Sequence, residues 1–394
     1  MLEARVLNGV GALPQGAWQR FFDGEPECWA YHRVAEQCPP DGFKLGAVGV
    51  YDGARPVAAA PVFRVDYRLD TALQGGLRRM SDWIYRRIPG LVSLPVLCLG
   101  SPLTDLCRIG IDPDLDVSER RRALGALLDG LERAAATDHV GLVALKNVAD
   151  SEAEWAHAGL AAAGFTRITS VPVAYLDITH GDLNSYIRAQ DAATAAYFRR
   201  KLRALSKLRI EYRRSIDGLE DQVNALYAQT RSQSGVDYGD FDALHPDYFR
   251  TVIEQLGDRA RLMLAWHDGQ LVSFQLFLRG SGEVVAKYIG MHYPLARELN
   301  AYFINWFMLI KFAMDHDIPR VQMGTTAYRA KVLLGARLER TWMYFRHRRR
   351  VPNGMLKVLA PLGDFERHDP ELKALRLGGR PVRGMPTAVD ALRV

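Results

Sequence analysis

The stretch VVAKYIGMHYPLARELNAYFINWFMLIKFAMDHDIPRVQMG, residues 284–324, holds the pattern that decides the fold of the second half of the chain. Residues 284–291 predict a strand, and Asn300 is the expected cap of a helix over 301–315. That helix is apolar nearly all round, so it must be buried on several sides or line an apolar cavity. Residues 320–323 predict a further strand. The succession is strand, loop, buried helix, strand.

The same order of elements occurs earlier in the chain. Residues 51–64, YDGARPVAAAPVFR, and residues 267–279, HDGQLVSFQLFLR, each place an Asp-Gly turn before a predicted returning strand. Both halves also end in a predicted helix, a glycine and a strand, around Gly164 and Gly335. This repetition predicts an internally duplicated α+β protein, each unit having a mixed, mostly antiparallel sheet flanked by helices.

Two further helices are predicted with definite ends. Ser118 is the expected cap of a helix whose buried stripe is made of leucines. A long helix is predicted over residues 186–208. Its polar side is strongly basic, which is typical of a solvated face or of a surface that binds polyanions. The basic residues are Arg199, Arg200, Lys201, Arg203 and Lys207.

Length and composition indicate the class of protein and the number of domains. The chain has 394 residues and an apolar fraction of 48%, which favours a globular protein of two domains, and we expect these over residues 1–180 and 181–350 with a tail over 351–394. Four cysteines without a CxxC pair, and the absence of a predicted span or metal motif, favour a cytoplasmic setting without a bound metal.

The net charge of +6 is informative through its clustering. Within the insert between residues 69 and 95, arginine pairs alternate with Trp83, Ile84 and Tyr85, as in an interfacial membrane segment or a solvated surface helix. We therefore expect an anionic membrane surface as one possible partner, with the protein peripheral at the inner membrane.

The order of elements resembles that of a GCN5-related N-acyltransferase (GNAT) unit, present twice. The second half is similar to the FemAB-like acyltransferases through the segments 197–208, 288–318 and 321–345. Related sequences have a glycine after the penultimate strand, then a tyrosine, a lysine and a glycine. The corresponding residues here are Gly324, Tyr328, Lys331 and Gly335. The resemblance implies transfer of an activated acyl group to an amine.

The first half is similar to bacterial ceramide synthases of this superfamily. The segments CWAYHRVAE, PVAAAPVFRVDYRLDT and CLGSPLTDLC carry this likeness. It implies acyl-CoA as co-substrate, no permanently bound cofactor, and a sphingoid-type lipid amine as acceptor; helix 301–315 would then be either core or a fatty-acyl channel. Two alternatives stay open. One is a FemAB-like transferase that uses aminoacyl-tRNA, and the other is a non-catalytic protein that binds RNA or membranes.

One departure from the family concerns the donor phosphates. Acetyl-CoA enzymes of the superfamily carry a glycine-rich loop after the third strand, whereas residues 292–300, HYPLARELN, contain no glycine. The helix beginning at Asn300 still offers backbone N–H groups to a phosphate, and Arg297 lies beside it. We therefore expect acyl-CoA as the donor, with an acyl-carrier protein or an aminoacyl-tRNA as the alternatives.

In this fold the third strand splays from its neighbour, which would place Lys287, Tyr288, Gly290 and His292 along the donor site. Of these, Tyr288 and Gly290 are expected to contact the donor. His292 is our first candidate for a general base or proton relay, against the alternative of a structurally bonded histidine.

Two further pairs are candidate catalytic residues. Tyr328 and Lys331 lie one helical turn apart, and either could protonate the leaving thiolate or contact phosphate, although an ordinary amphipathic helix has the same spacing. The segment SGVDYGDFDALHPDYF, residues 234–249, is rich in acidic and aromatic residues. Asp237 and His245 are expected to recognise an amino-alcohol head group, against the alternative of a hydrated loop.

Overall fold

The computed structural model describes residues 2–68, 93–233 and 243–377. The insert and the acidic segment singled out above therefore lie largely outside the described residues. The elements of the first half are β1 (Leu2–Leu7), η1 (Val10–Ala12), α1 (Gln15–Phe21), α2 (Trp29–Gln37), β2 (Lys44–Asp52), β3 (Arg55–Arg68), β4 (Ser93–Leu99), β5 (Gly110–Ile111), α5 (Val117–Thr137), β6 (Leu142–Ala149), α6 (Asp150–Ala162), β7 (Thr166–Thr169) and β8 (Val173–Asp177).

The second half continues with α7 (Leu183–Arg188), α8 (Ala192–Leu202), η2 (Arg203–Lys207), β9 (Arg209–Arg213), α9 (Glu220–Gln233), α10 (Tyr248–Leu256), η4 (Gly257–Arg259), β10 (Ala260–His267), β11 (Gln270–Arg279), β12 (Val284–Met291), α11 (Leu295–Glu298), α12 (Ala301–Asp315), β13 (Arg320–Gly324), α13 (Tyr328–Leu333), β14 (Arg337–Glu339) and β15 (Thr341–His347). The C-terminal part forms α14 (Arg350–Leu359), η5 (Ala360–Gly363), α15 (Phe365–His368) and α16 (Pro370–Leu377).

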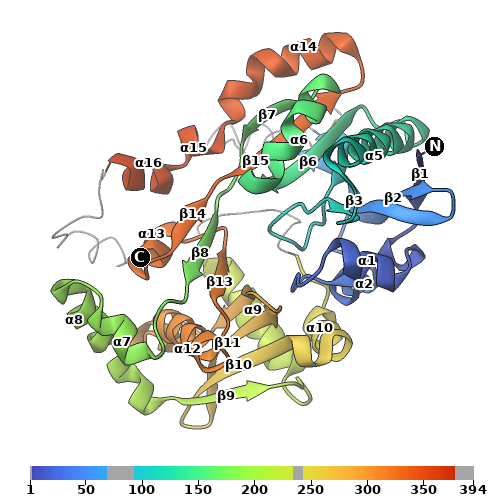
Figure 1. Cartoon of the computed structure of the whole chain (residues 1–394). Helices are drawn as coiled ribbons and strands as arrows, with labels where there is room; N and C mark the ends of the chain where they lie inside the picture. Colours follow the sequence, from blue (N-terminus) through green and yellow to red (C-terminus); the bar gives the residue numbers. More distant parts are fainter. Residues whose placement is uncertain (1, 69–92, 234–242, 378–394) are drawn as a thin grey trace.

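Two mixed sheets repeat one topology and exchange one strand. The first sheet has the order β1-β2-β3-β4-β6-β15-β7, and the second, read in the same direction, has β9-β10-β11-β12-β13-β8-β14. In each sheet one pair is parallel, β4 with β6 and β12 with β13. Figure 1 shows β15, from the end of the chain, within the first sheet, and β8 within the second. The internal duplication and the α+β class are confirmed.

The exchange complicates the division of the chain. Strand β8 pairs with β13 and β14 although it precedes residue 180, and β15 pairs with β6 and β7 although it belongs to the second half by sequence. The boundaries at residues 180 and 350 stay a prediction. Each sheet contains an inner strand from the opposite half, so neither half can complete its backbone hydrogen bonds alone.

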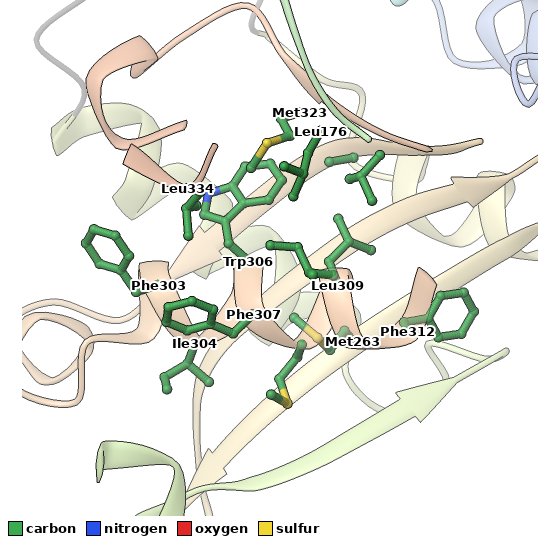
Figure 2. Close-up of a cluster of buried hydrophobic side chains, with 14 of the residues drawn as sticks. Leu176, Met263, Phe303, Ile304, Trp306, Phe307, Leu309, Phe312, Met323 and Leu334 are labelled. Carbon is green, nitrogen blue, oxygen red and sulfur yellow. The ribbon is translucent and has the colours of Figure 1, made fainter. Parts of the chain in front are cut away.

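The helix α12 fills the core of the second unit. Its apolar residues belong to one buried cluster, and Figure 2 shows Phe303, Ile304, Phe307 and Leu309 among them. Leu176, from β8, lies in the same cluster, so the exchanged strand also contributes to this core. Of the two interpretations of α12, core packing is the one that these contacts support.

Several helix ends differ from expectation. Asp116, not Ser118, caps α5: its side chain accepts from the N–H of Glu119, whose side chain in turn accepts from the N–H of Asp116. The helix expected over 186–208 is broken, because Asp191 accepts from two N–H groups and starts α8 anew. The expected tail is helical as far as residue 377.

Within the part of the chain that the structure describes, no helix combines the length and the apolar character needed to cross a bilayer.

Side chains from the two halves also pack directly against each other. Helix α2 packs against α10 of the second unit, and both contribute to one buried cluster with Tyr31, Val34, Tyr248 and Val252.

Because each sheet borrows an inner strand, we expect the two units to unfold together. The change Leu127→Ala empties part of the first core, where Leu127 is fully buried, and should cost about 2–5 kcal/mol. Hydrogen exchange followed by mass spectrometry should then show faster exchange in β11 and β12 as well as in β6. Faster exchange confined to the first unit would contradict shared stability.

Candidate functional site

The strands β12 and β13 separate after a short pairing. Their parallel register covers Val284 with Val321 and Val285 with Gln322, after which the strands diverge. A loop from the first half, residues 101–106, lies at this separation. Gln322 Nε2 donates to Asp105 Oδ2 over 3.3 Å, and Lys287 Nζ donates to the carbonyl of Leu103 over 2.7 Å. We call residues 101–106 the interdomain loop.

Strand β6 holds the interdomain loop in place. Lys146 Nζ donates to the carbonyls of Ser101 and Thr104, at 3.0 and 2.8 Å. Asn147 donates through Nδ2 to the carbonyl of Asp105 at 2.9 Å. Burial lowers the pKa of Lys146, a cost that these hydrogen bonds and the nearby Asp105 partly offset. The loop therefore presents Asp105 to the second unit from a fixed backbone.

A buried ion pair joins the halves next to this loop. Lys287 Nζ lies 2.5 Å from Glu27 Oε1, and the two side chains are 3% and 11% exposed. Burial would lower the pKa of Lys287, but the carboxylates of Glu27 and Asp105 outweigh it and raise that pKa, so the amine stays charged. The Tyr31 hydroxyl donates to the carbonyl of Leu103 at 2.8 Å and lies 2.7 Å from the Tyr248 hydroxyl.

Lys331 is a second buried amine, in a different electrostatic setting. It projects from α13, is 3% exposed, and its Nζ lies 5.7 Å from the centre of the Trp306 ring. Burial lowers its pKa to about 7, although Asp105 and Glu371 act in the opposite direction. At neutral pH a large fraction of Lys331 is therefore uncharged and able to accept a proton.

Gly324 leaves the space between Lys331 and Asp105 open. Its φ is +79°, and a Cβ at this position would lie 3.7 Å from Asp105 Oδ2 and 3.8 Å from Lys331 Nζ. The carboxylate and the amine thus border one small space at the end of β13. No ion pair within 4.0 Å links them among the described residues, so Asp105 acts on Lys331 through its charge.

Two polar atoms of α12, near Lys331, lie close to each other. Trp306 Nε1 and the Tyr302 hydroxyl are buried, and neither makes a well-aligned hydrogen bond to the described residues; burial raises the pKa of Tyr302, and the neighbouring Trp306 N–H partly opposes that rise. Their rings lie edge to face, 6.2 Å apart. Because nearly all buried donors in proteins are paired, unpaired ones indicate a place for a ligand's acceptor. An acyl carbonyl, on which negative charge develops during acyl transfer, fits such donors.

His292 ends β12 and turns toward the β10–β11 hairpin. The side-chain nitrogen of Gln270 lies 3.1 Å from His292 Nε2, so Nε2 accepts and the ring proton is on Nδ1. That Nδ1 is buried without a partner. As arranged, the ring has no free lone pair, so it suits hydrogen-bond donation better than the general-base role for which we selected it.

Other candidates on β12 are held by packing. The ring of Tyr288 meets those of Tyr227 and Tyr248 edge to face, and burial raises its pKa well above the usual value. Gly290 is covered, because a Cβ there would lie 2.1 Å from the Phe274 ring and 2.9 Å from the backbone of Leu226. Gly290 therefore serves the close approach of α9.

Helix α9 also occupies part of the edge of β12. The N–H of Met291 donates to Thr230 Oγ1 over 2.7 Å, and the N–H of Tyr293 donates to Gln229 Oε1 over 3.3 Å. Two N–H groups of the chain at the end of β12 are therefore bonded to side chains of α9.

The beginning of α12 is basic. Asn300 occupies the cap position with φ +52°, yet its side chain caps nothing and instead accepts from Lys201 Nζ over 2.6 Å. Arg297 is exposed, reaches Gln233 Oε1 at 3.3 Å and stacks on Tyr293. The structure thus brings Lys201 of the basic helix to Asn300, a contact that the sequence did not suggest.

Tyr328 holds α13 in place. Its buried hydroxyl donates to the carbonyl of Pro172 over 3.0 Å. At the start of α13, Glu371 of α16 accepts from the N–H groups of Tyr328 and Arg329, at 3.2 and 2.8 Å. These contacts give Tyr328 a positioning role beside Lys331. Glu371, which the sequence did not indicate, also helps to position α13.

The acidic segment contributes little that can be placed. Asp237 lies outside the described residues. His245 is exposed before α10, where its Nδ1 accepts from the N–H of Asp247 over 3.2 Å. This local contact resembles the hydrated loop that was the alternative interpretation. Next to it, however, α10 places Tyr248 in the buried cluster with Tyr31.

Comparisons with known proteins find a family match for the second unit and solved structures with the same fold. Residues 192–332 match the family described as acetyltransferase (GNAT) domain. The crystal structure of FemX superimposes with a TM-score of 0.58 at 12% identity, covering 88% of this chain and 98% of FemX. A tandem GNAT protein from the clavulanic acid biosynthesis pathway gives 0.50 at 15% identity, with the same coverages. No protein of curated function matches the sequence.

A third solved structure, a conserved protein of unknown function from Bacteroides thetaiotaomicron, gives a TM-score of 0.50 at 11% identity, covering 85% of this chain and 95% of that one. The fold is therefore the tandem GNAT fold in its FemAB-like form. The matched GNAT acetyltransferase domain, residues 192–332, includes Lys331 and most of the second unit.

The ion pair between the halves has a measurable energetic consequence. In the variant Lys287→Met, Glu27 remains buried without its partner, so we expect unfolding in urea to require about 3–5 kcal/mol less. Adding Glu27→Gln should restore part of this loss. The exposed pair of Lys311 and Asp315 provides a control, because Lys311→Met should cost less than about 1 kcal/mol. Equal losses of unfolding free energy in both lysine variants would show that the buried pair stabilises the protein no more than the exposed pair does.

Proposed function

We propose that the protein is an N-acyltransferase in which Lys331 accepts the proton that the acceptor amine loses. The observation that carries this proposal is the buried Lys331 amine with its pKa lowered to about 7, beside Asp105 and the Trp306 ring. A general base works best when its pKa is close to the working pH. Lys331 also lies beyond the separation of β12 and β13, where we expect the acyl donor to bind.

The reaction needs no covalent enzyme intermediate. The acceptor nitrogen attacks the donor carbonyl, the C–N bond forms, and the bond from carbon to the leaving group breaks. Lys331 takes the proton from the nitrogen and returns it to the leaving group, a thiolate in the case of a thioester. Trp306 Nε1 and the Tyr302 hydroxyl would donate to the carbonyl oxygen as it becomes negative.

In its finer form the proposal names acyl-CoA as donor, bound without a permanent cofactor. Lys201, Arg297 and the first N–H groups of α12 would hold its phosphates. The finer acceptor is the amine of a sphingoid-type lipid, with the enzyme peripheral at the cytoplasmic face of the inner membrane. Support for a long acyl chain does not come from α12, whose apolar side chains fill the core.

One observation favours a second candidate, the transfer of an aminoacyl group from tRNA. Backbone N–H groups at the end of β12 already donate to Thr230 and Gln229, so fewer of them are free to bond a pantetheine arm. At the same time, α8 and η2 expose a basic surface beside Asn300, made of Arg199, Arg200, Arg203 and Lys207. A polyanion such as tRNA fits that surface, and its binding would weaken steeply with salt.

The pH dependence of the rate tests the role of Lys331. Since only the neutral amine accepts a proton, kcat/KM should rise with pH through a midpoint near 7 and level off at higher pH. Lys331→Met should lower the rate by about 10²–10⁴-fold and remove this limb. Asp105→Asn removes a charge that raises the pKa of Lys331, so its limb should move to lower pH.

The exposed Lys311, on the neighbouring α12, supplies the matched control, and Lys311→Met should leave the profile unchanged. Circular dichroism would confirm that each variant is folded. A Lys331→Met protein that keeps the wild-type rate and limb would remove Lys331 from the mechanism.

The donor is identified by product analysis. Purified protein is incubated with a sphingoid base and acyl-CoAs of graded length, and in parallel with aminoacyl-tRNA and an amine acceptor. For the finer proposal we expect free thiol and the amide by mass spectrometry. Deacylation of tRNA without thiol release, abolished by Arg199→Glu with Arg203→Glu, would establish the second candidate instead.

A further inference from the structure

The helix α14 turns its apolar side away from the protein. Val351, Met355, Val358 and Leu359 are 76%, 62%, 79% and 51% exposed, and no residue of the helix is buried. In Figure 1, α14 forms the outer edge of the molecule above β7 and β15. A surface helix of a soluble protein ordinarily buries its apolar stripe, so this orientation is the reverse of the usual one.

The exposed residues form one continuous stripe. Positions 351, 355, 358 and 359 follow the spacing of three and four residues that places side chains on the same side of a helix. The opposite side, which includes Pro352, Asn353 and Leu356, is half-buried against the protein. Covering these side chains removes apolar surface from water, so the stripe favours binding to an apolar partner.

The stripe is bordered by cations. Arg349 precedes the helix, and Arg350 and Lys357 lie along the border of the stripe. Among the described residues these three form no ion pair, whereas Arg346 and Arg348 of the same basic run both reach Glu132. An outward apolar stripe with basic residues at its border is typical of a helix that lies in the interface of an anionic bilayer.

We propose that α14 docks into the surface of an anionic lipid bilayer, with Val351, Met355 and Val358 between the headgroups and Arg349 and Arg350 against the phosphates. The charges argue against a second copy of the chain, because a two-fold contact along this stripe would bring like charges together, Arg350 to Arg350 in a parallel pair or Arg350 to Lys357 in an antiparallel pair. The proposal does not rest on the acyltransfer mechanism, since it concerns only the surface of the helix.

Docking would orient the catalytic unit as well. After α14 the chain continues through α15 to α16, where Glu371 bonds the start of α13, the helix that carries Lys331. The same C-terminal segment therefore connects the proposed membrane surface with the candidate site. A lipid-like acceptor would meet the enzyme at a defined orientation.

Vesicle co-sedimentation tests the proposal on the full-length protein. The wild type should bind vesicles of phosphatidylcholine with phosphatidylglycerol and bind phosphatidylcholine alone weakly. Val351→Gln with Val358→Gln should reduce the partition coefficient by about tenfold or more. Arg349→Glu with Arg350→Glu should remove the preference for anionic vesicles. The matched control is Val117→Gln, since Val117 is 66% exposed on α5 and should not affect binding.

A second measurement reports on α14 itself. In Met355→Cys, an environment-sensitive dye should shift to shorter wavelength on binding vesicles, and Cys28, Cys38, Cys98 and Cys107 are all buried and should not react. Unchanged vesicle binding by the Val351→Gln and Val358→Gln protein would overturn the proposal, as would a dye signal that is insensitive to vesicles. A change of oligomeric state in that variant would assign the stripe to a second copy instead.

Discussion

The exchange of β8 and β15 is the constraint on which the rest of the structure depends. A strand inside a sheet satisfies backbone donors and acceptors on both sides, so each unit needs the other to complete its hydrogen bonds. The exchange also brings the halves close enough for α2 and the interdomain loop to pack on the second unit. A site assembled from both halves follows directly from this pairing.

Two buried lysines near the contact between the halves show how the surroundings of an amine determine its charge. Lys287 faces Glu27 and keeps its charge, so it serves as a structural cation between the units. Lys331 is buried to the same extent without a carboxylate in contact, and its pKa falls toward neutrality. The same side chain is thus an ion-pair partner in one place and a candidate base in the other, because a carboxylate contacts Lys287 and none among the described residues contacts Lys331.

Much of the fold could be predicted from the sequence, and part of the site. Strand β12 and helix α12 have the predicted bounds, since apolar periodicity is a local property. The sequence indicates Lys331 as a candidate because it follows Gly324. It also indicates His292 at the end of β12, but Gln270 bonds the acceptor nitrogen of His292 in the structure. No local pattern indicates Asp105 or Glu27, because each has a partner more than 200 positions away.

The sequence by itself determined the order of the elements, the duplication, the buried character of α12 and the basic side of α8. The character of each helix follows from spacings of two to four residues, which a local segment contains in full, and the duplication follows from the recurrence of one order of such segments. Only the tertiary structure decided which strand enters which sheet, which carboxylate meets which lysine, and that the apolar side of α14 faces outward. Those outcomes depend on contacts between distant segments and on the loss of water around charges, and no short segment of the chain determines either of them.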